Sequence, residues 1–170
     1  MPVKKLLLLC SLSAALLTPA AVAGARQKPV PAPASQKVKR VLNGTARAIE
    51  IYRVSGSLRG AMRHVQVVEE EVAALTYILP AESPLMNALQ LARNSLTQAA
   101  IISDAYRGRR RIPDEDMEHL SMMCDEYGVP PGRGGRLQTG ECVRAIMREL
   151  RQRHREAASV ASREGVYKAR

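Results

Sequence analysis

Two consecutive segments of the chain repeat apolar residues in steps of three and four, and a short proline-flanked connection joins them. The segments cover residues 57–79 and 84–107, with Pro80 and Pro84 at the junction. This spacing predicts two helices with one apolar face each. Because the connection is so short, the two helices must form a long antiparallel hairpin. The apolar positions of the first segment are Leu58, Ala61, Val65, Val68, Val72, Leu75 and Leu79.

Helical spacing also predicts three further helices. The first covers 36–53, with Ser35 as its N-cap and with Asn43-Gly44 as a weak point at which the helix could kink or split. The second lies between Pro113 and Gly128, and the third begins at Thr139 or Gly140. The chain has no Trp, no Phe and five Tyr, so its core must be aliphatic, and few residues favour strands. We therefore predict an all-α fold, a small bundle of about five helices.

The order of segments along the chain predicts export. Residues 1–23 combine a basic start, an apolar stretch and an Ala-x-Ala site, which is typical of a secretory signal peptide. Residues 24–34 contain three prolines and predict an extended linker. The helical domain is expected over 35–165, with a frayed tail over 166–170. After cleavage no apolar run is long enough to span a bilayer, so we expect a periplasmic or secreted protein.

The cysteines agree with export. Cleavage of the leader would remove Cys10 and leave Cys124 and Cys142 with 17 residues between them. A single pair in an oxidising compartment predicts a disulfide, worth about 3 kcal/mol in the chain-entropy model. A zinc site is the alternative, with His119, His154 or an aspartate as further ligands, but no ligand spacing typical of zinc supports it.

No constellation of residues is typical of catalysis or of a cofactor. The sequence lacks a Ser-His-Asp order, a nucleophile elbow and a phosphate-binding loop. Glu69–Glu71 is interpreted as an acidic surface run beside the apolar face. A cluster of soft ligands could suggest Cu(I), but on a helix its members do not converge, and core packing explains the methionines better. We therefore predict no catalytic residue, metal or cofactor; the soft cluster is Met117, His119, Met122, Met123 and Cys124.

Charge is unevenly distributed along the chain. The net charge is +10 at pH 7, and it falls to +8 when the two lysines of the leader are removed. Residues 24–53 and 130–170 each carry a net +6, whereas 113–129 carry −6. In an exported protein, basic regions point to an anionic lipid, an envelope polymer or an acidic protein. Nucleic acid is disfavoured because no aromatic residues interleave the charges. A cluster at Arg107 and Arg109–Arg111 is more typical of a solvated helix end.

The candidate binding surface is an arginine row in the last predicted helix. Its members recur at i, i+4, i+7 and i+11, so they share a narrow arc beside the apolar face. Guanidinium groups in a line can bind a polyanion or several carboxylates. The alternative is internal pairing with acids of the preceding helix, namely Asp114, Glu118 and Asp125. We call the row the arginine stripe, and it consists of Arg144, Arg148, Arg151 and Arg155.

Two function classes follow from these features. The first is a non-catalytic envelope protein that binds an anionic or macromolecular partner through basic helix faces. The second rests on a resemblance. A leader, a small helical bundle, a disulfide and charged faces together look like some periplasmic immunity proteins that act against secreted effectors. That resemblance lies at the level of architecture and implies an inhibitor that blocks an effector enzyme.

Overall fold

The computed structural model describes residues 30–105, 114–133 and 137–167. Over these ranges the chain forms five α-helices and one 3₁₀ turn, η1, and contains no strand. This confirms the prediction of a small all-α bundle. The helices are α1 (Ala32–Ser55), α2 (Met62–Leu75), α3 (Pro84–Ala105), α4 (Asp114–Glu126) and α5 (Thr139–Arg163), and η1 covers Arg59–Ala61.

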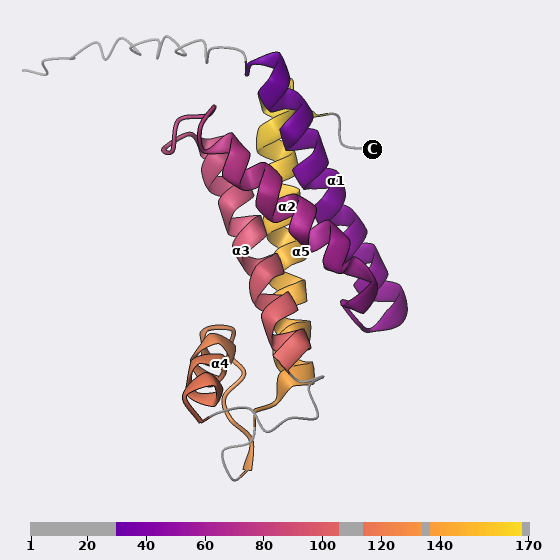
Figure 1. Cartoon of the computed structure of the whole chain (residues 1–170), viewed down its shortest axis with the longest axis vertical. Coiled ribbons are helices and arrows are strands. Elements are labelled where there is room, and N and C mark those ends of the chain that lie inside the picture. The colour runs from indigo at the N-terminus through magenta and orange to yellow at the C-terminus, as the bar shows by residue number, and fades with distance from the viewer. Residues whose placement is uncertain (1–29, 106–113, 134–136, 168–170) are drawn as a thin grey trace, which may run out of the picture.

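The four longer helices run alternately down and up the bundle, and α4 lies at one end (Figure 1). The antiparallel hairpin of α2 and α3 is confirmed, but the most extensive packing is between α1 and α2 and between α3 and α5. The core between them is aliphatic, as the composition requires. Its largest fully buried side chains include Leu42, Leu75, Leu89, Leu96 and Ile146.

The helix predicted over 57–79 is shorter in the structure, because turns occupy both of its ends. Before it, the backbone N–H of Arg59 donates to Ser57 Oγ at 3.2 Å, and η1 precedes the start of α2 at Met62. After Leu75 the chain turns, and Thr76 Oγ1 donates to the carbonyl of Ala73 at 2.7 Å. Ser and Thr favour such local side-chain hydrogen bonds over continued helix.

The start of α3 follows its prediction. The side chain of Ser83 accepts a hydrogen bond from the backbone N–H of Met86 at 3.1 Å, and Pro84 occupies the first helical position. This is the arrangement expected of an N-cap followed by a proline that needs no amide hydrogen. The predicted end of this helix at 107 lies outside the described residues.

The first helix begins earlier than predicted. It starts at Ala32 with Pro31 as N-cap, so the prediction of Ser35 as N-cap is wrong. The hydroxyl of Ser35 instead donates to the carbonyl of Pro31 at 3.3 Å. Proline is tolerated in the first helical turn, where its missing N–H would have no partner. The last three residues of the predicted linker 24–34 therefore belong to α1, and Ala34 is buried.

Gly44 does not split α1, which was one of the two outcomes considered for this position. The helix is continuous through this position, and Gly44 is buried against α2. A Cβ atom at position 44 would lie 2.9 Å from Val68 Cγ2 and 3.6 Å from the carbonyl oxygen of His64. The glycine therefore permits a close approach of α1 and α2.

The acidic run of α2 contributes to helix packing. Glu71 accepts hydrogen bonds from Lys37 Nζ at 2.9 Å and from Arg40 Nη1 at 2.8 Å, so it ties α2 to α1. Burial by itself raises the pKa of Glu71, but these two cations outweigh that effect and lower it. Glu69 accepts from Thr97 Oγ1 of α3 at 2.8 Å. The run thus links three helices, in addition to lying beside the apolar face.

The chain after α5 is ordered by a glycine cap. Gly165 adopts φ +72°, and its N–H donates to the carbonyl of Ser162 at 3.0 Å. The N–H of Val166 donates to the carbonyl of Ala161 at 2.9 Å, and the Val166 side chain is buried in the core. This Schellman motif satisfies the last carbonyls of the helix. Within the tail predicted to fray, 166–170, Val166 thus packs on the core, and the last three residues lie outside the described chain.

Candidate functional site

The predicted disulfide joins the end of α4 to the start of α5. Cys124 and Cys142 are bonded, their Cα atoms lie 5.3 Å apart, and both residues are fully buried. A Cα separation in this range is typical of disulfides. Both cysteines are thus engaged with each other and packed in the core, which places α4 directly beside the helix that carries the arginine stripe.

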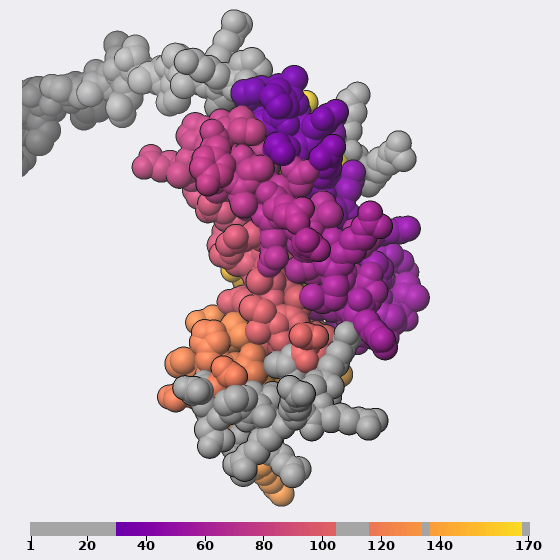
Figure 2. Space-filling view, in the orientation of Figure 1, coloured from indigo at the N-terminus to yellow at the C-terminus, as the bar shows by residue number. Residues whose placement is uncertain are grey.

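One further polar contact holds α4 at this end of the bundle, where Figure 2 shows it next to α3. The hydroxyl of Tyr127 donates to Gln98 Oε1 of α3, and partial burial raises the pKa of Tyr127. Gly128 ends α4 as predicted, with φ +71°, and the N–H of Val129 donates to the carbonyl of Cys124 at 3.0 Å. The disulfide therefore ties α4 to α5, and the Tyr127–Gln98 hydrogen bond ties its end to α3.

The arginine stripe lies along the exposed face of α5. All four of its side chains are exposed, whereas Ile146, Met147 and Leu150 on the inner face are buried. Arg144 Nη2 lies 3.7 Å from Glu141 Oε1, and 62% and 58% of the two side chains are exposed. Within the described part of the chain, the other three arginines make no ion pair. The stripe is thus open to solvent along its length.

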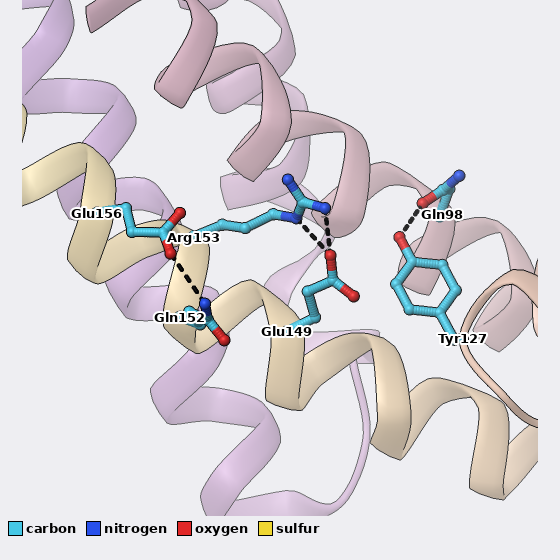
Figure 3. Close-up of polar contacts among 6 residues, drawn as sticks. All are labelled: Gln98, Tyr127, Glu149, Gln152, Arg153 and Glu156. Carbon is cyan, nitrogen blue, oxygen red and sulfur yellow. Dashed lines mark hydrogen bonds and ion pairs between the residues drawn. The ribbon is translucent and has the colours of Figure 1, made fainter. Parts of the chain in front are cut away.

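Two glutamates of α5, Glu149 and Glu156, bond to neighbours outside the stripe. Arg153, about half a turn around the helix from Arg144, donates from Nε to Glu149 Oε1 at 2.7 Å (Figure 3). Gln152 Nε2 donates to Glu156 Oε1 at 2.9 Å. The helix carries six arginines and three glutamates, a net +3. Two of the three glutamates are therefore occupied by neighbours outside the stripe, and the positive charge remains concentrated on the stripe.

The acids of α4 do not pair with the stripe in the part of the chain that the structure describes. Glu118 and Asp125 are exposed, and neither lies within ion-pair distance of an arginine of α5. The side chain of Asp114 and the predicted cluster Arg107 and Arg109–Arg111 lie outside the described residues. At Glu118 and Asp125, the internal pairing considered from the sequence is thus not formed.

A polar cleft of about 430 Å³ lies beside the stripe, between α4 and the outer surface of α5. Tyr127 contributes one wall, and the Glu149–Arg153 pair contributes the other (Figure 3). Arg148 belongs both to the stripe and to this cleft. The cleft could not be foreseen from the sequence, because the disulfide brings Tyr127 and α5 together only in the folded chain. The ion pair of Glu149 and Arg153 could be foreseen from their i, i+4 spacing.

The soft ligands considered for Cu(I) do not converge. Met122 and His119 are exposed, Met123 is buried, and Cys124 is bonded to Cys142. Over the described residues, no three His, Cys, Asp or Glu side chains gather closely enough to hold a metal ion.

His154, the other ligand considered for zinc, is half-buried on α5. Burial lowers its pKa, and its Nδ1 has no hydrogen-bond partner among the described residues. An imidazole in this environment favours the neutral form.

In the described part of the chain, none of the helices has the length and apolar character needed to cross a bilayer. No family model, characterised protein or solved structure matches this chain.

Proposed function

We propose that this is an exported, non-catalytic helical protein that binds an anionic envelope partner through the arginine stripe. The observation that carries the proposal is the exposure of four guanidinium groups along one face of a helix whose inner face is buried. Each guanidinium can pair a carboxylate or phosphate with two hydrogen bonds. Arg144 and Arg155, at the ends of the stripe, are eleven steps apart along the chain, so the groups span about 16 Å at the rise of an α-helix.

Export is part of the proposal and rests on two features. Residues 1–23 have the order of a secretory signal peptide. The disulfide between Cys124 and Cys142 is of the kind that persists in oxidising compartments. An anionic partner in such a compartment would be a lipid headgroup, an envelope polymer or an acidic protein.

The proposal is tested with the secreted form, that is, the chain without its predicted signal peptide 1–23, by measuring its binding to three anionic probes. The probes are phosphatidylglycerol vesicles, lipopolysaccharide and polyglutamate, each measured at low and high salt. The test variant is R148Q/R151Q, which removes two charges from the middle of the stripe. The matched control is R47Q/R63Q, which removes two exposed charges from α1 and α2 and leaves the same net charge.

We expect R148Q/R151Q to weaken binding to at least one probe about tenfold, which corresponds to about 1.4 kcal/mol. Thermal stability should change little, since both side chains are exposed. R47Q/R63Q should have a much smaller effect on binding. An equal loss in both variants would mean that binding follows net charge instead of the stripe. Lost stability with unchanged binding would assign the stripe a structural role.

A second candidate function is the immunity-type inhibitor, and one observation favours it. Tyr77 is 91% exposed in the turn between α2 and α3, next to the partly exposed Ile78. An exposed tyrosine is typical of residues that dominate protein interfaces. A one-to-one complex with a secreted enzyme that Y77A weakens, and that high salt leaves intact, would support this function over the first.

A further inference from the structure

A second cavity lies where α5 begins, between the ends of α1 and α3. Its volume is about 330 Å³. Figure 1 shows the start of α5 beside the end of α3 at this end of the bundle. Buried Ile102 and Val143 supply apolar lining, and hydroxyl-bearing side chains from three helices complete it. The cavity is larger than one water molecule requires and is suited to a small group or the end of a larger ligand.

Three hydroxyl groups line this cavity without a hydrogen-bond partner in the described part of the chain. Thr139 is 7% exposed, and its hydroxyl makes no hydrogen bond to any residue in the described chain. The same holds, over those residues, for the hydroxyls of Ser103 on α3 and Tyr52 on α1. Thr139 is buried, whereas Tyr52 and Ser103 are half-buried. Because these hydroxyls face the cavity and make no hydrogen bond within the described chain, an acceptor supplied from outside can pair with all three.

The first turn of α5 adds further donors. Its N-cap, Gln138, makes no side-chain cap, and its carbonyl accepts from Glu141 and Cys142, at 3.0 and 2.9 Å. The first N–H groups of a helix, here those of Thr139 and Gly140, have no partner within the helix and carry partial positive charge. The cavity therefore offers amide donors in addition to its hydroxyls.

Arg144 supplies the cation at the edge of the cavity. Its contact with Glu141 is long, at 3.7 Å, and both side chains are mostly exposed, so the guanidinium can turn to a ligand. The ends of α1 and α3 also border the cavity, and carbonyl groups at helix ends add partial negative charge. Because these carbonyls offset part of the positive charge of Arg144, the cavity suits a ligand group with a single negative charge.

We propose that this cavity binds one oxyanion group, a phosphate or a carboxylate, and anchors the end of the partner that lies along the arginine stripe. The inference deepens the proposed function and rests on it, because Arg144 belongs to both surfaces. Hydroxyls of Tyr52, Ser103 and Thr139 donate to the oxyanion, together with the first amides of α5. The stripe then continues the contact along the helix.

Titration of inorganic phosphate, and separately of acetate, into the secreted form tests this site by ¹H–¹⁵N spectroscopy. We expect the amide signals of Thr139 and Gly140 to shift and saturate with phosphate, acetate or both. T139V keeps the side-chain shape and should weaken the affinity roughly tenfold, the size expected for one hydrogen bond to a charged group. Y52F removes a single oxygen atom and tests the same site if T139V does not fold. R163Q, at the far end of α5, is the control and should leave the affinity unchanged.

The two probes separate the sources of the oxyanion. Saturation by phosphate alone assigns a phosphorylated ligand, saturation by acetate alone assigns a carboxylate, and saturation by both assigns a general oxyanion site. Absence of saturation with either, or equal affinity of T139V, Y52F and the unaltered chain, would overturn the inference. If that happens while R148Q/R151Q still loses polyanion binding, the cavity fails and the proposed function stands. If phosphate or acetate saturates the site while R148Q/R151Q binds polyanions normally, the cavity stands as an oxyanion site and the proposed function fails.

Discussion

Replacing Gly44 by alanine tests whether the close approach of α1 and α2 stabilises the bundle. In an open helix this change would raise stability by up to about 1 kcal/mol, because alanine has the higher helix propensity. Here the new Cβ would meet Val68 Cγ2 at 2.9 Å, and a helical valine has one strongly preferred rotamer. Overpacking of this kind costs about 1–3 kcal/mol. We therefore expect G44A to lower the free energy of unfolding by about 1 kcal/mol.

A double-mutant cycle with V68A isolates the contact. V68A alone should destabilise the protein, because Val68 is fully buried. In that background the alanine at position 44 has room, and its helix propensity should make G44A stabilising by up to about 1 kcal/mol. The sign of the G44A effect thus reverses, with a coupling energy of about 2 kcal/mol, within the range known for residues in contact. Urea unfolding followed by circular dichroism measures all four proteins.

Gly140 provides the control for helix propensity. A Cβ at this position of α5 meets nothing within 4 Å, so G140A should be neutral or stabilising. The reasoning is refuted if G44A stabilises the unaltered protein, or if its effect is the same with valine and with alanine at position 68. Either result would mean that α1 and α2 can separate slightly at no cost.

Three further predictions concern the disulfide and two titrating groups. Replacing Cys124 and Cys142 together by serine should lower the free energy of unfolding by about 3 kcal/mol, measured by urea denaturation, and an unchanged midpoint would contradict this. Because burial lowers the pKa of His154, stability should be full above pH 6.5 and fall as the pH drops through the lower folded value; H154Q should flatten that decline in thermal melts. Burial raises the pKa of Glu71, but the hydrogen bonds and charges of Arg40 and Lys37 lower it by more, so its folded pKa lies below 4.5. The stability that the Glu71 carboxylate contributes is therefore present above pH 4.5 and is lost as the pH falls through the folded pKa. E71Q should therefore remove that acid dependence, whereas E70Q should retain it.

Helix positions were predictable from sequence where the periodicity was long and the caps were specific. The segment beginning at Ser83-Pro84 carries both signals, and α3 starts there. Gly128 was likewise predictable as the end of α4, because a glycine after an amphipathic run favours the left-handed cap. The disulfide could be predicted because the sequence beyond residue 23 has just two cysteines.

Errors arose where tertiary contacts override local preference. Gly44 is unfavourable in an isolated helix, but its contact with Val68 exists only once α1 meets α2. Val166 lies in the segment that was expected to fray. The sequence does not reveal that the turn at Gly165 brings its side chain back into the core. The same applies to the site. The spacing of the arginine stripe can be read from the sequence, whereas the hydroxyls around Thr139 come from three separate helices and meet only in the folded chain.

The pairing of helices has a consequence for the order of folding. α1 and α2 are adjacent in sequence, whereas α3 and α5 are separated by residues 106–138, which must close as a loop before these two helices dock. Local contacts cost less chain entropy to form, so we expect the α1–α2 pair to assemble first and the α3–α5 pair to dock late. Substitutions at Val68 should then slow folding, whereas substitutions at Ile146 should mainly speed unfolding.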